Sequence, residues 1–169
     1  MTLEDLLRQH KSVILEKWIN SLVDSYPADT SRFIKAQNDP FANPVGNTIS
    51  NGLDSVFDDL ICSKKTSGMT SFLNSILKIR AVQNFSPSQA VSFVFSLKNI
   101  VKDVLRKENI DNRLTKELFE FDSRIDQLGL IAFDIYEECR EKLYEIKANE
   151  ERNRTFSAFE RAGLIREVD

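Results

Sequence analysis

Histidine and cysteine are scarce in this sequence: its 169 residues include one histidine and two cysteines. A zinc site takes three or four ligands, so this composition predicts no zinc centre. His10 lies near the start of the chain, far from where a haem-ligating histidine would face a pocket, and we expect a structural or surface role for it. The sequence also lacks a phosphate-binding glycine loop, a nucleophile elbow and a Ser-His-Asp set. We therefore expect no enzyme activity, no metal and no cofactor.

The two cysteines, Cys62 and Cys139, each fall on the apolar stripe of a predicted helix. We expect both to be buried, reduced thiols, and a disulfide or redox pair is the alternative. The first residues, MTLEDLLRQHK, are acidic and amphipathic, which is unlike a signal peptide. Together these features predict a cytoplasmic protein.

Turn-forming residues and positive charge are also limited, with five glycines, four prolines and a net charge of −3. So few turn residues disfavour an all-β fold with many tight turns. A nucleic-acid or anionic-membrane surface needs an excess of basic residues, so we expect no nucleic-acid partner. The longest apolar run is shorter than the roughly 20 residues that span a bilayer, and we expect no direct membrane insertion.

The strongest pattern runs from residue 111 to about residue 149. Apolar residues recur there every three or four positions, which is the spacing of one face of a helix. They are Leu114, Leu118, Phe121, Ile125, Leu128, Ala132, Ile135, Cys139, Leu143 and Ile146. A second apolar row of Leu130, Ile131, Phe133 and Tyr136 leads us to expect burial on most sides of this segment. The pattern predicts one long, unbroken central helix.

Shorter amphipathic segments precede this helix and predict an all-α domain of five to seven helices. We place them at residues 2–25, 29–37, 48–61, 70–82 and 87–107. Ser86, Pro87 and Gln89 form a capping-box signature at the last of these, in which Phe95 is expected to point inward. We predict a helical domain over residues 1–149 and a charged helical extension over residues 150–169.

Four charged residues lie on or beside the apolar stripes: Arg80, Lys98, Asp126 and Asp134. A charge drawn into a core is costly unless it is paired. They could form salt bridges between helices at the rim of the core, or remain in solvent. The sharper hypothesis is a cavity where Arg80 or Lys98 meets an anionic small ligand, or where ion pairs exchange partners as a switch.

The charged extension contains a few apolar residues that would be poorly placed on a free, solvated end. These residues, Phe156, Phe159, Leu164 and Ile165, are our candidates for a partner interface. At about 1.5 Å per residue, fifty helical residues would reach about 75 Å, so we expect the end to project, bend or pair with another subunit.

Three stretches of the chain are similar to a known family: LEKW, FSPSQAVSFVFSLKNIV and RIDQLGLIAFDIYEECREKLYEIKANEERNR. They resemble the N-terminal domains of RsbR and RsbRD-type proteins, the RsbT co-antagonists of bacterial stressosomes, and most of all the stand-alone versions of that domain. The resemblance implies a globin-like fold without haem, dimerisation, and a signal passed along the C-terminal helix. In RsbR this helix leads to a STAS domain, and since the sequence ends at Asp169 we expect none here.

We therefore predict a non-enzymatic, cytoplasmic sensory or regulatory domain that acts through helix-mediated contacts. It would form a homodimer through the central helix and its extension, and a ligand or regulatory partner would alter the packing that is read at residues 146–165. The alternative is an accessory protein for a membrane electron-transfer complex linked to sulfite reduction, with a redox-complex partner. The resemblance implies this alternative because stand-alone members occur near genes for such a complex.

Overall fold

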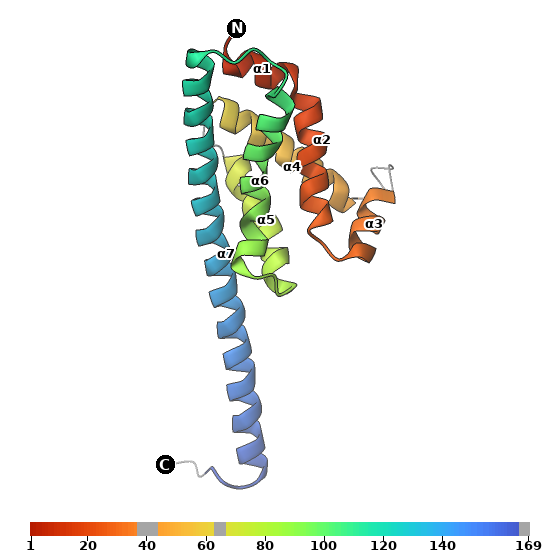
Figure 1. The fold of residues 1–169 in the computed structure, drawn as a ribbon. Helices are drawn as coiled ribbons and strands as arrows, with labels where there is room; N and C mark the ends of the chain where they lie inside the picture. Colours follow the sequence, from red (N-terminus) through yellow and green to blue (C-terminus); the bar gives the residue numbers. More distant parts are fainter. Residues whose placement is uncertain (37–43, 63–66, 166–169) are drawn as a thin grey trace.

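A computed structural model of the chain describes residues 1–36, 44–62 and 67–165. This part of the chain forms helices and no strands, which confirms the predicted all-α fold with a long C-terminal helix. The helices are α1 (Leu3–Gln9), α2 (Lys11–Asp24), α3 (Ala28–Ala36), α4 (Pro44–Ile61), α5 (Ser67–Val82), α6 (Pro87–Leu105) and α7 (Asn112–Arg161). In Figure 1 the first six helices gather beside the upper part of α7.

Side chains in the sequence set the starts of three helices. The capping box predicted at α6 is present: Ser86 accepts from the Gln89 N–H, and Gln89 accepts from the Ser86 N–H. Thr2 and Asp5 form a second capping box at α1, and Asp111 caps the first turn of α7. These caps satisfy N–H groups that the helices themselves leave without acceptors.

The predicted first helix, residues 2–25, is wrong in one respect because it is divided into α1 and α2 at His10. His10 leaves the helical conformation, with φ −98° and ψ 8°, and its Nε2 lies 3.0 Å from Oε1 of Glu108. The break lets α1 lie across the end of α7, where the Leu3 N–H donates to the Glu117 carboxylate at 2.7 Å. The apolar stripe continues through the break, so its spacing gave no sign of the turn.

The core lies between α7 and the shorter helices. Trp18 of α2 is fully buried, and its indole N–H donates to the Phe93 carbonyl of α6 at 2.7 Å, which satisfies the one polar atom of the ring. Phe57 stacks edge-on between Trp18 and Phe121, with ring centroids 6.5 Å apart in both pairs. These rings join α2, α4, α6 and α7 into one apolar core.

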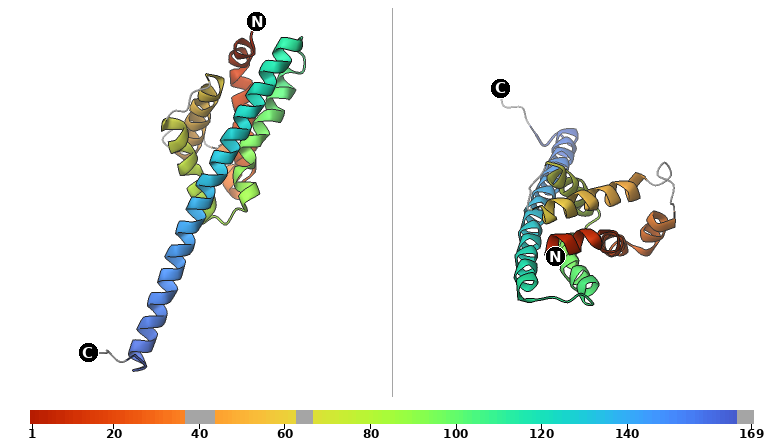
Figure 2. Two further views of the ribbon diagram at one scale, coloured as in Figure 1. Left: turned by 90° about the vertical axis from the view of Figure 1, so that its left-hand side faces the viewer. Right: turned by 90° about the horizontal axis from the view of Figure 1, so that it is seen from above.

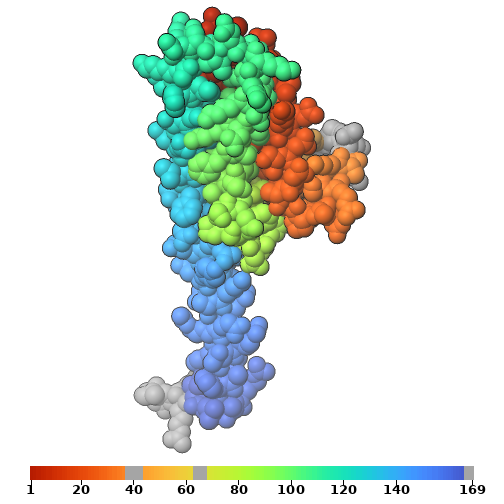
Figure 3. Space-filling model, in the orientation of Figure 1, coloured from red at the N-terminus to blue at the C-terminus, as the bar shows by residue number. Residues whose placement is uncertain are grey.

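The last part of α7 projects from the body as a single helix. α7 has 50 residues, and it continues through residues 149 and 150 without an end. Figures 2 and 3 show it leaving the body as a narrow rod. The central helix is therefore unbroken, as predicted, while the domain boundary at residue 149 stays a prediction.

Candidate functional site

Arg80 of α5 lies inside the core, with none of its surface exposed. Its Nη1 donates to the carbonyls of Gln89 and Ala90 in the first turn of α6. Its Nη2 donates to the carbonyl of Leu22 and to the hydroxyl of Ser25 at the C-terminal end of α2. The side chain therefore ties the end of α2 and the start of α6 to α5.

The Arg80 charge has no carboxylate among these partners. The rings of Tyr26, Phe85 and Phe93 surround its guanidinium, with centroids 4.9, 4.9 and 5.1 Å from Cζ. The carbonyls at the end of α2 add the negative end of the helix dipole. Burial lowers the pKa of the guanidinium from its usual value. Arg80 is therefore a structural cation that joins α2, α5 and α6.

The other three charged candidates lie apart from Arg80, on or near the solvent side. Lys98 of α6 pairs with Asp126 of α7 at 2.6 Å, and Lys102 pairs with Asp122 one turn away at the same distance. Asp134 is exposed and has no ion pair among the described residues. The structure thus brings together Lys98 and Asp126 but not the whole set of four, and their ligand or switch role stays a prediction.

Exposed apolar side chains lie close to these ion pairs, since Leu130 is one helical turn beyond Asp126 on α7. Leu130 is 66% exposed and Phe133 is 44% exposed, so the expectation of burial on most sides of this segment is wrong. Phe95 of α6 is 37% exposed, and its ring lies over Gly129, where a Cβ would be 2.2 Å from Cζ. We call Phe95, Leu130 and Phe133 the α6–α7 patch.

Gly129 is a sign in the sequence that could have pointed to the α6–α7 patch. A glycine inside an otherwise regular helix often marks a close approach of another group, and here Gly129 lets a phenyl ring of α6 lie directly on α7. The inward direction predicted for Phe95 is wrong: its ring covers Gly129 at the solvent edge of the contact between α6 and α7, and it does not enter the core. Helix spacing alone cannot tell a side chain at that edge from one in the core.

A second set of contacts holds α7 at the level where it leaves the body. The Tyr136 hydroxyl donates to the Phe85 carbonyl, and Arg140 donates to the Ala81 carbonyl and the Asn84 side chain. All three partners lie at the turn between α5 and α6, which Arg80 holds from the inside. Any shift of α7 along its axis must therefore break these contacts or move this turn.

The four predicted interface residues lie at the outer end of α7. Phe156, Phe159 and Leu164 are exposed, and Ile165 is partly buried. The helix ends in a Schellman motif: the Leu164 N–H donates to the Phe159 carbonyl, and the Gly163 N–H donates to the Glu160 carbonyl. Gly163 has a φ of 68°, which favours glycine over other residues. The projecting part of α7 thus has a defined C-terminal end, which carries apolar side chains.

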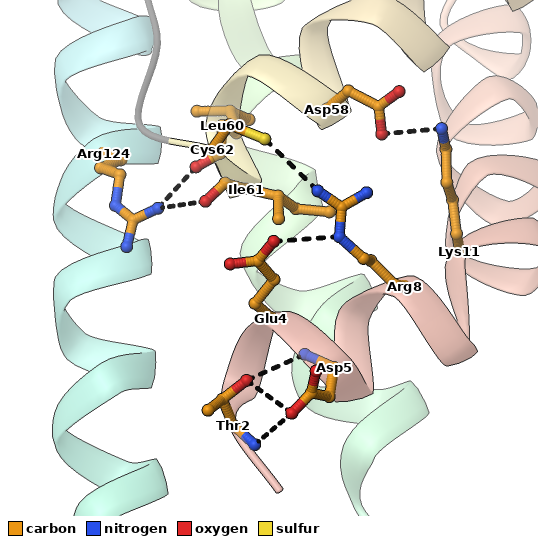
Figure 4. A network of polar contacts seen from close by, with 10 residues as sticks. All are labelled: Thr2, Glu4, Asp5, Arg8, Lys11, Asp58, Leu60, Ile61, Cys62 and Arg124. Carbon is orange, nitrogen blue, oxygen red and sulfur yellow. Dashed lines mark hydrogen bonds and ion pairs between the residues drawn. The ribbon is translucent and has the colours of Figure 1, made fainter.

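Polar contacts also fix the N-terminal part of α7 (Figure 4). Arg124 donates to the carbonyls of Leu60 and Ile61 at the C-terminal end of α4, at 2.6 and 3.1 Å. Nearby, Arg8 of α1 donates to the sulfur of Cys62 at 3.3 Å. Cys62 is exposed, which corrects the expectation that both thiols are buried, and both cysteines are free.

The described residues hold no group of three or more histidine, cysteine or carboxylate side chains placed to bind a metal ion. Within the same residues, no helix has the length and apolar character needed to cross a bilayer. The features that the structure does show are exposed apolar side chains and interhelical contacts.

Comparison with known families gives the class of the protein. Residues 12–150 match the family described as the RsbT co-antagonist protein rsbRD N-terminal domain. The chain belongs to this family, whose members are stressosome-related signalling domains. No curated protein and no solved structure matches the chain.

Proposed function

We propose that the chain is a non-enzymatic sensory or regulatory module of the cytoplasm that works as a homodimer through the α6–α7 patch. The observation that carries this proposal is the exposure of Leu130 and Phe133 in the middle of the most regular helix of the chain. Large apolar side chains gathered on one helix face are typical of a contact surface. Membership of a signalling family supports the same conclusion.

The surroundings of the patch resemble the rim of a protein interface. The ion pairs Lys98–Asp126 and Lys102–Asp122 lie beside it and bridge α6 to α7. Interfaces commonly have an apolar centre with a polar, solvent-accessible rim. A second copy docked here would form a bundle from α6 and α7 of both subunits, and isologous pairing would place like residues near the two-fold axis.

Signal transfer would follow from how α7 is held. A ligand or partner that changes the α5–α6 turn alters the contacts of Tyr136 and Arg140, and α7 then repacks against the body. Because α7 is one rigid helix, the change appears at residues 146–165, including the exposed Phe156 and Phe159. In this mechanism α7 has two alternative packings against the body, and different partners favour different packings.

Sedimentation velocity of the full chain and of the double variant L130E/F133E tests the dimer. We expect a dimer for the native chain and a monomer for the variant, since two carboxylates would be buried unpaired in the interface. Val13 is an exposed apolar residue on α2, so V13E serves as a control and should remain a dimer. A native chain that is monomeric at high concentration would refute the proposal.

Removal of residues 146–169 separates the roles of the patch and of the outer end. A chain that ends at residue 145 keeps the patch and should still dimerise, but it should no longer capture proteins that bind residues 146–165 from cell extracts. Regulatory kinases or phosphatases captured with the full chain support the regulatory role. Subunits of a membrane redox complex would instead support an accessory role in its assembly.

A further inference from the structure

An open groove lies between α5 and α7, at the level where α7 leaves the body. Its volume is about 440 Å³. The residues that line it are Asn74, Ser75, Lys78 and Val82 from α5, and Cys139, Lys142, Leu143 and Ile146 from α7. These positions cover about two turns of each helix, so the groove matches the size of a short helical segment.

The floor of this α5–α7 groove is apolar and lacks a cover in the described chain. Val82 is 60% exposed and Ile146 is 55% exposed, while Cys139 and Leu143 are partly buried against the core. A ligand side chain placed here would remove apolar surface of both helices from water, and burial of such surface is the main source of affinity in helix-binding grooves.

The charge of the groove is of one sign. Among the residues that the structure describes, Lys78 and Lys142 are the only charged ones that line it, and no carboxylate does. Neither lysine forms an ion pair or hydrogen bond within the described residues. Elsewhere Lys98 and Lys102 reach carboxylates at 2.6 Å. The groove is therefore positively charged, although the chain as a whole has a net charge of −3.

We propose that the α5–α7 groove binds an acidic amphipathic helix of a partner protein, and this rests on the proposed regulatory function. Apolar residues at i and i+3 or i+4 of that helix lie on the floor formed by Val82, Leu143 and Ile146. Aspartate or glutamate residues at its edges pair with Lys78 and Lys142. Helix-in-groove binding suits a site built from two helices, because the described residues offer no strand edge for β-augmentation.

The projecting end of a second copy does not fit this groove. Its exposed rings, Phe156 and Phe159, lie among Arg152, Arg154 and Arg161, so the segment lacks an excess of carboxylates. Two lysines at the groove would repel these arginines as much as they attract the nearby glutamates. The chemistry therefore favours a different, acidic protein.

Binding in the groove would also act on the signal path. The occupant would contact α5 up to Val82 and α7 up to Ile146, on either side of the level where Arg140 joins the two helices. It would then hold the first part of the projecting rod against the body. The groove thus provides a partner with a direct way to bias the packing of α7.

The experiment uses the full chain and a labelled 18-residue peptide with leucine at every third or fourth position and glutamate elsewhere. Fluorescence anisotropy should show saturable binding, which weakens at least about tenfold in K78E/K142E because two attractions become repulsions. Lys17 and Lys116 are exposed and unpaired within the described residues, so K17E/K116E changes the net charge equally and should bind within about twofold of the native chain. A matched peptide with lysine in place of glutamate should not bind.

Amide chemical shifts of the native chain should change on α5 and α7 around the groove when the acidic peptide is added. Absence of binding at millimolar peptide, equal binding of both peptides, or equal loss in K17E/K116E would overturn the proposal. Displacement of the acidic peptide by a peptide of residues 144–161 would assign the groove to a second copy and overturn the choice of a different protein. The dimer remains a separate test, since K78E/K142E should sediment like the native chain.

Discussion

Replacement of the buried Arg80 by methionine tests how this fold is held together. Methionine keeps an unbranched, apolar stem of similar length but removes the guanidinium, its four donated hydrogen bonds and its contacts with three rings. The sign of the effect is not trivial, because a buried cation also carries a desolvation cost that the variant avoids.

The size of the stability change depends on which hydrogen bonds the partners of Arg80 keep in the R80M variant. The Leu22 carbonyl still accepts from the N–H and hydroxyl of Ser25, and the Gln89 carbonyl still accepts from the hydroxyl of Ser92. No carbonyl is left wholly unpaired, so the cost is the charged hydrogen bonds themselves, at about 1.5–3 kcal/mol each. Three of the four bonds are longer than 3 Å, so we take the lower value, about 6 kcal/mol in total. Avoided desolvation returns about 3 kcal/mol of this. We expect the free energy of unfolding to fall by about 3 kcal/mol.

Urea denaturation followed by circular dichroism measures this change. For an m-value of about 2 kcal/mol/M, a loss of about 3 kcal/mol lowers the midpoint by about 1.5 M. Arg106 is exposed and makes no side-chain bond within the described residues, so R106M should stay within about 0.5 kcal/mol of the native chain. An R80M chain as stable as the native one would refute this prediction. It would show that the desolvation free energy of the buried guanidinium is as large as the free energy that its contacts contribute.

Three further changes probe the packing and its dependence on pH. G52A should destabilise the chain by about 1–3 kcal/mol, because its Cβ would lie 2.0 Å from the ring of the buried Phe72, and thermal unfolding would show a lower midpoint. G129A should be nearly neutral in the same assay, because the partly exposed Phe95 can swing away while alanine favours the helix, and the displaced ring should weaken dimerisation. The Leu3 N–H lowers the pKa of Glu117, so its contribution to stability is complete above its usual pKa near 4.5 and is lost as the pH falls through the lower, folded-state value. Acid titration of the unfolding midpoint should therefore be flatter below pH 4.5 in E117Q than in the native chain.

Much of the fold was predictable because helix periodicity is a local property. The apolar spacing from Leu114 to Ile146 predicted one unbroken helix, and α7 is unbroken from Asn112 to Arg161. Ser86, Pro87 and Gln89 predicted the start of α6 to the residue because a capping box uses side chains close in sequence. Both signals depend on neighbours within four residues of each other.

The functional surfaces were less predictable because they depend on which helices meet. Leu130 and Phe133 share the apolar character of the core residues, and they are exposed because no helix of the described part of the chain covers them. Arg80 continues an apolar stripe, yet nothing near it in sequence shows that the end of α2 supplies acceptors for its charge. The lysines of the groove come from α5 and α7, more than sixty positions apart.

The two proposed contact surfaces lie on different sides of the same helix. Leu130 of the patch and Leu143 of the groove are 13 residues apart, which at about 100° per residue places them roughly 140° apart around α7. A dimer that covers Leu130 therefore leaves the groove open, so each subunit can hold its own acidic helix. We expect L130E/F133E to remove the dimer while the labelled acidic peptide binds as before, with one peptide per chain in both states. Loss of peptide binding in this monomeric variant would mean that the groove forms only within the dimer, and the two surfaces would then have to be treated as one site.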